Sequence, residues 1–448
     1  MSNGKVSGNT AKETGGGIYG MNFNSAKGEI TVSGGEISGN TANIAGTLAG
    51  GGIRSSYKLT VSGGTIKTNK TTKPSGWGGG ISVSEEFTFL GGTVVGNTCP
   101  GGGTVQGTGI HVWNCSVKMS GSAKVDTNND IYLSDNIKIT VIAPLTGTAP
   151  VARITPAAYN TTTQVLTAGT GVTLANETYK FAVTPKIVSG TPQPWTVGGN
   201  GCLKQGRYTE VPYDDLETYL ANASSTEVNY IEVTDIPAAD LKGSFVSNSA
   251  NPGPLGKKIT DNLSKKVALK LPDGLSDVTS MRGCFSQCRN LISVENIPSN
   301  VTDMCWCFFY CDSLITAPDI PSGVTNMSDC FDACTSLTVA PNIPSGVTDM
   351  EAYFNSCIKL TQGPDIPSSV THMEACFRNC TSLQSVKIKC NYIAGKFNNA
   401  FKDCTSLQDG GIQVPNGSYN DYTTDSALTD MGVPGNTPAE KKAKFSGF

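Results

Sequence analysis

The feature that most constrains this chain is a phrase of 23 residues that recurs between positions 279 and 411. Methionine returns at this interval in five successive copies, and phenylalanine, cysteine and leucine return in step with it. A fixed period of this length is typical of a solenoid, in which small units stack and bury their apolar faces against one another. We therefore expect a long repetitive scaffold here, and a function that depends on its surface.

One copy, residues 327–349, indicates how each unit folds. Its apolar side chains have the spacing of one stripe of a short helix or helical turn; they are Met327, Cys330, Phe331, Cys334 and Leu337. A short strand is expected at 337–340, and the prolines at 341 and 344 require a turn, because proline fits neither a helix interior nor a central strand. The repeat therefore predicts an α/β solenoid with strands on one face and helical turns on the other.

Residues 1–135 carry a different repeat, which predicts a right-handed parallel β-helix. Gly-Gly-Gly-Ile begins at positions 15, 50 and 78, and a Val-Ser-Gly-Gly phrase or its equivalent begins at positions 32, 61 and 89. Short alternating runs divided by glycine are typical of strands and tight bends. We expect three short strands per coil, with neighbouring coils about 4.8 Å apart.

A column of asparagines has the same phase in successive coils of this region: Asn9, Asn40, Asn69, Asn97 and Asn128. Asparagine tolerates left-handed backbone, and its amide both donates and accepts hydrogen bonds, so we interpret the column as a structural ladder rather than a ligand site. The opening residues 5–10 match only the last strand of a coil. The first coil is therefore expected to be incomplete, with an open edge that favours pairing with another chain.

The other boundaries follow from changes in sequence pattern. Residues 136–206 lose the period but stay β-like, and we expect a cap of the β-helix or a small β-domain there. Residues 207–278, with a helical pattern at 213–221, are expected to cap the second solenoid at its N-terminal end. Its repeats occupy residues 279–411, and residues 412–448 form a C-terminal cap or tail. The predicted fold is β-rich: two solenoids in tandem.

The chain has 15 cysteines. One column recurs with the 23-residue repeat: Cys288, Cys311, Cys334, Cys357, Cys380 and Cys404. We interpret these cysteines as buried free thiols that fill space. A second column replaces cysteine by Tyr353 and Ala400, which a core position tolerates and a ligand position does not. A disulfide or a metal site in the first column is the alternative, although an odd total leaves at least one thiol unpaired.

The phrase at 317–337, Ala-Pro-Asp-Ile-Pro-Ser-Gly-Val-Thr-Asn-Met-Ser-Asp-Cys-Phe-Asp-Ala-Cys-Thr-Ser-Leu, resembles the BspA-like leucine-rich-repeat surface proteins of host-associated anaerobic bacteria. The Gly-Gly-Gly-Ile and Val-Ser-Gly-Gly phrases resemble the right-handed β-helix repeats of polymorphic outer-membrane and adhesin-type proteins. These resemblances imply a secreted or lipid-anchored surface protein without catalytic residues, and an anoxic habitat in which thiols stay reduced. No export or lipidation signal is visible, so we expect these signals to lie outside this chain.

Several functional classes are disfavoured. A net charge of −3 with 15% charged residues gives no electrostatic footprint for nucleic acid, and no apolar run is long enough to span a membrane. A polysaccharide lyase or hydrolase with a β-helix fold would need paired carboxylates. Acids are sparse in the β-helix; they are Glu13, Glu29, Glu36, Glu85, Glu86, Asp126, Asp130 and Asp135. Residues 126–130 resemble the start of a calcium loop, but Ile131 and Ile137 stand where glycine and glutamate are required. We expect no enzyme activity, no cofactor and no metal.

Some positions vary between copies while the frame of the repeat does not; they are Ile292, Ile315, Thr338, Thr361 and Gln384. On a solenoid such positions can hold binding specificity, although drift on a solvent-facing surface would give the same pattern. We therefore expect an extracellular cell-surface protein, an adhesin or interaction module for a host or bacterial surface protein or glycan. The alternative is a structural rod or filament subunit that assembles through the open β-helix edge, and a polysaccharide-active enzyme is the third possibility.

Overall fold

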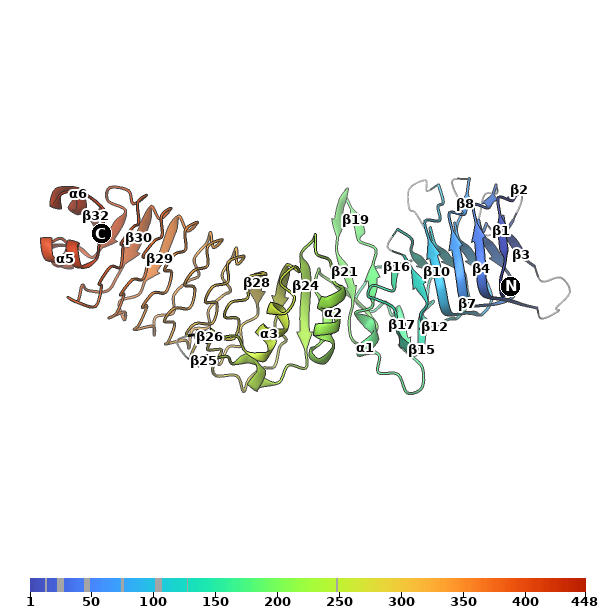
Figure 1. The fold of residues 1–448 in the computed structure, drawn as a ribbon, viewed down its shortest axis with the longest axis horizontal. Helices are drawn as coiled ribbons and strands as arrows, with labels where there is room; N and C mark the ends of the chain where they lie inside the picture. The colour runs from blue at the N-terminus through green and yellow to red at the C-terminus, as the bar shows by residue number, and fades with distance from the viewer. Residues whose placement is uncertain are drawn as a thin grey trace. The chain divides into compact units, whose positions relative to one another are not determined.

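The structure is a computed structural model that describes residues 1–12, 14–21, 28–43, 49–73, 76–100, 107–126, 128–246 and 249–448. The chain divides into two compact units, Met1–Val211 and Pro212–Phe448. Each unit is a stack of coils in which strands pair in parallel with the equivalent strands of the next coil (Figure 1). The predicted fold class of β-rich tandem solenoids is confirmed. Among the described residues, none of the helices has both the length and the apolar character that a bilayer crossing requires.

Unit 1 is a parallel β-helix with three sheets. The largest sheet contains β1 (Lys5–Ser7), β4 (Glu29–Ser38), β7 (Lys58–Lys67), β10 (Phe87–Val95), β12 (Val117–Gly121), β13 (Lys124–Val125), β15 (Ile139–Leu145) and β17 (Leu166–Ala168). The second contains β3 (Ile18–Gly20), β6 (Ile53–Ser55), β9 (Ile81–Val83), β11 (Ile110–Val112), β14 (Ile131–Leu133), β16 (Ala152–Pro156) and β18 (Phe181–Val183). The third contains β2 (Thr10–Ala11), β5 (Thr41–Ala42) and β8 (Lys70–Thr71).

The repeated phrases explain this arrangement. The isoleucine of each Gly-Gly-Gly-Ile phrase begins a strand of the second sheet. Ile53 and Ile81 of two such phrases pair in register, Ile81 also pairs with Ile110 of the weaker copy Gly-Thr-Gly-Ile at 107–110, and all three are fully buried. In the largest sheet the Gly-Gly pair bends one long strand, so that two of the three expected strands are continuous in β4, β7 and β10. Gly64 has φ +86°, and a Cβ at Gly63 would come within 2.5 Å of a backbone oxygen of the neighbouring coil. Only glycine fits this bend without strain.

The two large sheets continue past residue 135, where the β-helix was expected to end. β15 and β17 extend the first sheet, and β16 and β18 extend the second. The sequence period is lost there because the connections change in length, while the alternation that builds the strands persists. The helix α1 (Ala175–Thr178) and two antiparallel hairpins complete the unit; the hairpins are β19 (Lys186–Val188) with β20 (Thr191–Gln193), and β21 (Trp195–Val197) with β22 (Leu203–Gln205).

Unit 2 begins within β23 (Thr209–Pro212) and carries short helices at both ends of its repeats. Before the repeats lie η1 (Tyr213–Asp215), α2 (Leu216–Asn222), β24 (Asn229–Thr234), η2 (Ala238–Leu241), β25 (Ser244–Val246), β26 (Ser249–Asn251), α3 (Pro254–Thr260) and β27 (Val267–Lys270). The repeats contain β28 (Leu291–Glu295), β29 (Gln362–Ile366) and β30 (Ser385–Ile388). After them come β31 (Ile412–Val414), η3 (Asn416–Ser418), α4 (Tyr419–Tyr422), α5 (Asp425–Asp430), α6 (Pro438–Ala443) and β32 (Phe445–Gly447).

The apolar stripe of each repeat is buried as predicted, but it is a run of turns and not a helix. Asp329 and Ala333 have left-handed backbone, with φ of +53° and +57°, which interrupts any helix. Their amide nitrogens donate to carbonyl oxygens of the next coil, Asp329 to Glu351 at 2.9 Å and Ala333 to Asn355 at 2.8 Å. Of the two expected forms, a short helix or a helical turn, the helix is therefore corrected: within the coil, amide nitrogens donate to carbonyl oxygens three residues back, as Cys330 does to Met327 and Cys334 to Phe331 at 3.1 Å, and these bonds alternate with bonds to the next coil.

Candidate functional site

The column of variable positions forms a row along the strand face of unit 2, in which Ile292 is half-buried and the other four positions are exposed. The amide nitrogen of Ile315 donates to the carbonyl oxygen of Ile292 at 3.1 Å, and that of Thr338 donates to the Ile315 carbonyl at 3.1 Å. Further along, the amide nitrogen of Gln384 donates to Thr361 at 2.8 Å. Ile315 is 45% exposed and the neighbouring Val339 is 61% exposed, whereas the leucines of the same coils are fully buried. The backbone of these coils therefore exposes apolar side chains to solvent on the strand face.

A hollow of about 740 Å³ adjoins this row. It is lined by residues of three successive coils, including Lys270, Asp273, Glu295, Thr316 and Asp319. The lining includes three carboxylates and one lysine, and Asp319 is exposed. The hollow and the apolar row together offer a surface that is complementary to a chain carrying apolar and basic groups.

The recurring cysteines form a second regular column, on the inner side of the same coils. From Cys311 onward each thiol donates a hydrogen bond to the carbonyl oxygen of a phenylalanine in the preceding repeat, as Cys334 does to Phe308 and Cys357 to Phe331, at 3.1 and 3.2 Å. The first thiol, of Cys288, donates to the carbonyl oxygen of Gly256 at 3.4 Å. The phenylalanine rings stack from coil to coil with centroids 5.3 to 5.9 Å apart. Burial raises the pKa of the Cys334 and Cys357 thiols well above its ordinary value. The column therefore packs the core and satisfies backbone carbonyls.

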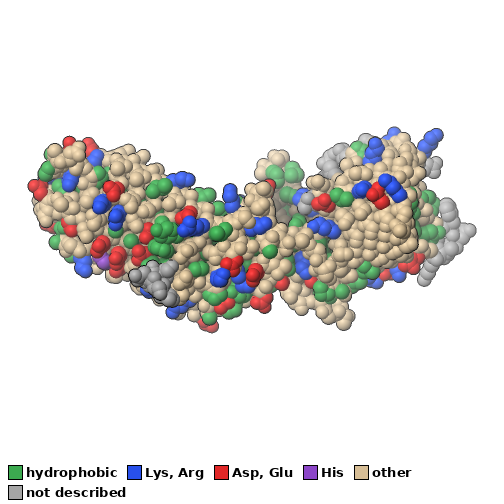
Figure 2. Space-filling view, in the orientation of Figure 1, with side chains coloured by type: hydrophobic (Ala, Val, Ile, Leu, Met, Phe, Trp, Pro, Cys, Tyr) green, Lys and Arg blue, Asp and Glu red, His purple; other side chains and the backbone are tan. Residues whose placement is uncertain are grey.

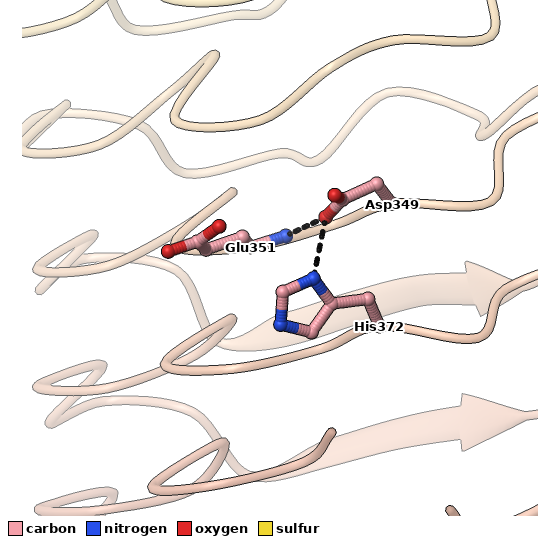
Figure 3. A group of neighbouring side chains, drawn as sticks. All are labelled: Asp349, Glu351 and His372. Carbon is pink, nitrogen blue, oxygen red and sulfur yellow. Dashed lines mark hydrogen bonds and ion pairs between the residues drawn. The ribbon is translucent and has the colours of Figure 1, made fainter. Parts of the chain in front are cut away.

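An acidic group with one histidine lies at the turn side of two adjacent coils (Figure 3). Nδ1 of His372 is 3.3 Å from an oxygen of Asp349, and that oxygen also accepts a hydrogen bond from the amide nitrogen of Glu351 at 2.9 Å. Nε2 of His372 is 3.7 Å from an oxygen of Glu374. The sequence had singled out none of these residues. The 23-residue period could have indicated the group, because His372 is equivalent to Asp303, Asn326 and Asp349 in successive repeats and is therefore expected beside Asp349.

Comparison with known families agrees with this geometry. A family model described as the BspA type leucine rich repeat region, in 6 copies, matches residues 262–376 and 307–424. Residues 262–424 are a BspA-type leucine-rich-repeat region. Proteins with BspA-type repeats are typically bacterial surface proteins, and leucine-rich repeats generally mediate protein interactions. No curated protein and no solved structure matched the chain.

Outside the BspA-type repeats, unit 1 contains the asparagine ladder. Side-chain and backbone nitrogens of Asn40 and Asn69 donate to the side-chain oxygen of the next asparagine at 2.9 to 3.0 Å. Asn97 donates in the same way to Asn129, and not to Asn128 as expected. The correction has a simple cause. Val94 and Val125 are equivalent, because they pair in register. The ladder asparagine comes three residues after Val94, at Asn97, but four residues after Val125, at Asn129.

An aromatic cluster surrounds His111 in the second sheet of unit 1. The imidazole is fully buried and stacks on Tyr132, with ring centroids 5.4 Å and ring planes 8° apart. The ring of Trp77 lies against it at a tilt of 47°, with centroids 4.6 Å apart. In the described part of the chain neither ring nitrogen has a hydrogen-bond partner. Burial, and then the charge of Arg54, lowers the pKa of His111 to about 3. The ring is therefore neutral at physiological pH.

The described acids of unit 1 named below each contact their own partners and do not face one another across a groove. Glu86 forms an ion pair with Lys118 at 2.6 Å. Asp130 accepts hydrogen bonds from the amide nitrogens of Gly107 and Thr108, at 3.2 and 2.6 Å, so it closes a turn. Glu13, and Thr127 of the suggested calcium loop, lie outside the described residues. On the face shown in Figure 2, positive and negative side chains are interspersed.

Proposed function

We propose that the protein is an extracellular bacterial surface protein, an adhesin or interaction module, which binds a partner protein through the strand face of its BspA-type repeats. The observation that carries this proposal is the exposure of Ile315 and Val339 on the strand face, in repeats whose methionine, phenylalanine and leucine columns are buried. Exposed apolar side chains beside a polar hollow are a common composition for a protein-binding surface. The acidic groups of the hollow favour a partner with basic side chains at its rim.

Binding can be measured with the purified chain on immobilised fibronectin, fibrinogen and mucin, and on a glycan array. The test variant is Ile315→Thr with Val339→Gln, because Thr338 and Gln362 already occupy the same two columns in other coils. The matched control is Ile358→Thr, which removes an isoleucine that is 41% exposed and borrows the residue of its own column, Thr335. We expect the double variant to weaken binding by about tenfold or more, as loss of a central apolar contact does, and the control to bind normally.

Three outcomes would contradict the proposal. Binding that survives the double variant unchanged would place the contact elsewhere on the chain. Sedimentation showing polymers that grow with concentration would favour the structural rod. Cleavage of a polysaccharide by the purified chain would favour an enzyme.

A further inference from the structure

Asp349, Glu351, His372 and Glu374 occupy two neighbouring columns of two adjacent coils. Asp349 and His372 form a parallel bridge, and the amide nitrogen of Ala352 donates to the carbonyl oxygen of Glu374 at 2.8 Å, which sets Glu351 beside Glu374. Residues two apart on an extended chain point to the same side, about 6.5 Å apart, and neighbouring coils are about 4.8 Å apart. The backbone therefore directs three carboxylates and one imidazole to one small area.

The side chains converge as the backbone predicts. One ligand-type atom from each of Asp349, Glu351 and His372 lies within 4.8 Å of the other two. The imidazole contacts Asp349 through Nδ1 and approaches Glu374 through Nε2, at 3.3 and 3.7 Å. Figure 3 shows Asp349 and Glu351 on one coil and His372 on the next. The three residues are half-buried or exposed, so an ion has access to them.

No other pair of coils carries such a set in these two columns. The first column holds Ser280, Asp303, Asn326, Asp349 and His372, and the second holds Arg282, Cys305, Ser328, Glu351 and Glu374. Where a carboxylate occurs nearer the start of the repeats, a cation balances it: Arg282 lies 3.8 Å from Asp303. In the described part of the chain, Glu351 forms no ion pair with a lysine or arginine. Three carboxylates and a single imidazole thus leave a local excess of negative charge.

We propose that Asp349, Glu351 and His372 bind one divalent transition-metal ion of the Zn²⁺ class. Two carboxylate oxygens and one imidazole nitrogen are a ligand set that such ions accept, with water in the open position. Glu374 is a positioning residue: when Nδ1 binds the metal, the N–H at Nε2 donates to its carboxylate and fixes the ring. Ca²⁺ and Mg²⁺ prefer oxygen ligands throughout, so the imidazole favours the softer ions. The bound ion would join two coils that are otherwise held by backbone hydrogen bonds and packing.

The test is calorimetric titration of the full chain, stripped with chelator, with Zn²⁺ and separately with Ca²⁺. We expect one Zn²⁺ per chain and much weaker binding of Ca²⁺. The variants His372→Asn, Glu351→Ser and Glu374→Ser each borrow a residue of the same column, Asn326 or Ser328, so the fold should tolerate them. The first two remove a ligand and should weaken binding by about a hundredfold, and Glu374→Ser should weaken it by about tenfold. Zn²⁺ should raise the melting temperature of the wild type and not that of His372→Asn.

The matched control is Asp319→Asn, which removes one carboxylate from a column that already holds Asn296 and Asn342. It should bind Zn²⁺ like the wild type. Cysteines are the competing ligands, and Co²⁺ distinguishes them because thiolate ligands give an intense near-ultraviolet band that carboxylate and imidazole do not. A wild type that binds no Zn²⁺, a His372→Asn variant that binds it equally well, or a thiolate band with Co²⁺ would each overturn the proposal.

Discussion

The side-chain oxygen of Asn69 accepts two hydrogen bonds from Asn40, one from its backbone nitrogen at 3.0 Å and one from its side-chain nitrogen at 2.9 Å. The side-chain nitrogen of Asn69 donates in turn to the carbonyl oxygen of Ile37 at 2.9 Å. Asn69 is fully buried, so no water can replace these bonds. Each inner rung of the ladder therefore satisfies polar groups on the two coils beside it.

Replacement of Asn69 by alanine should destabilise unit 1 strongly. The variant leaves donors of Asn40 and the carbonyl of Ile37 buried without partners, and we expect a loss of about 3 kcal/mol or more in the free energy of unfolding. Asn9→Ala is the control, because Asn9 is exposed and only donates to Asn40, and it should cost less than about 1 kcal/mol. Urea denaturation measures both, and equal losses would show that the ladder does not act as described.

His111 should make unit 1 less stable in mild acid. Its pKa is about 3 in the folded chain and about 6.5 in an unfolded one, so the unfolded state binds more protons between these values and stability falls as the pH is lowered. From pH 7 to pH 5 the loss should be about 2 kcal/mol. His111→Phe keeps the stacking on Tyr132 without a titrating group. Tryptophan fluorescence reports unfolding, because the ring centroids of Trp77 and Trp113 lie 4.6 and 6.2 Å from that of His111. An equal pH dependence in both proteins would contradict the prediction.

Asp332 should have the opposite effect in unit 2. Burial, and then the charge of Asp329, raises the pKa of Asp332 to about 7. The folded state therefore holds the proton more tightly than the unfolded state, and stability falls as the pH rises from about 4 to about 7. Asp332→Asn should be more stable than the wild type at pH 8, by about 4 kcal/mol, and the difference should nearly vanish at about pH 4. Urea denaturation at both values tests this, and a constant difference would contradict it.

The thiols should fall into two classes. Thirteen cysteines are buried, while Cys99 and Cys202 are half-buried. With a chromogenic disulfide reagent at pH 8, we expect Cys202 to react first and Cys99 slowly, because burial raises the pKa of Cys99 to about 11. In denaturant without reductant, all fifteen should react. A count below about half would show that the columns contain disulfides rather than free thiols.

The solenoid architecture could be predicted from the sequence because the same pattern of buried positions recurs in every copy of the repeat. The spacing of Met327, Phe331 and Leu337 identified the buried side of a coil, and the structure buries all three completely. The spacing could not distinguish a helix from successive turns, since both bring the same side chains to one face. The left-handed backbone at Asp329 and Ala333 decides between them, and neither residue type demands it.

The side-chain groupings were harder to predict for the same reason. Asn128 and Asn129 differ by one residue of connection length, which an average period cannot resolve. The group around His372 combines residues of two coils, and it forms only because the two coils pair in register. The sequence of a single copy does not reveal it. The strand-face row of Ile315 and Thr338 could be found because a column that varies is visible in the aligned copies themselves.

The hydrogen bonds that run between coils on the turn side have a consequence for length. On the strand side and on the turn side alike, each copy is joined to the next by backbone hydrogen bonds. Each 23-residue repeat therefore adds one strand spacing, about 4.8 Å, to the length of unit 2. Duplication or loss of a whole copy would lengthen or shorten the reach of the protein by that increment and leave every remaining coil in register. The length of the repeat region can therefore change in steps of one coil without a change in the fold.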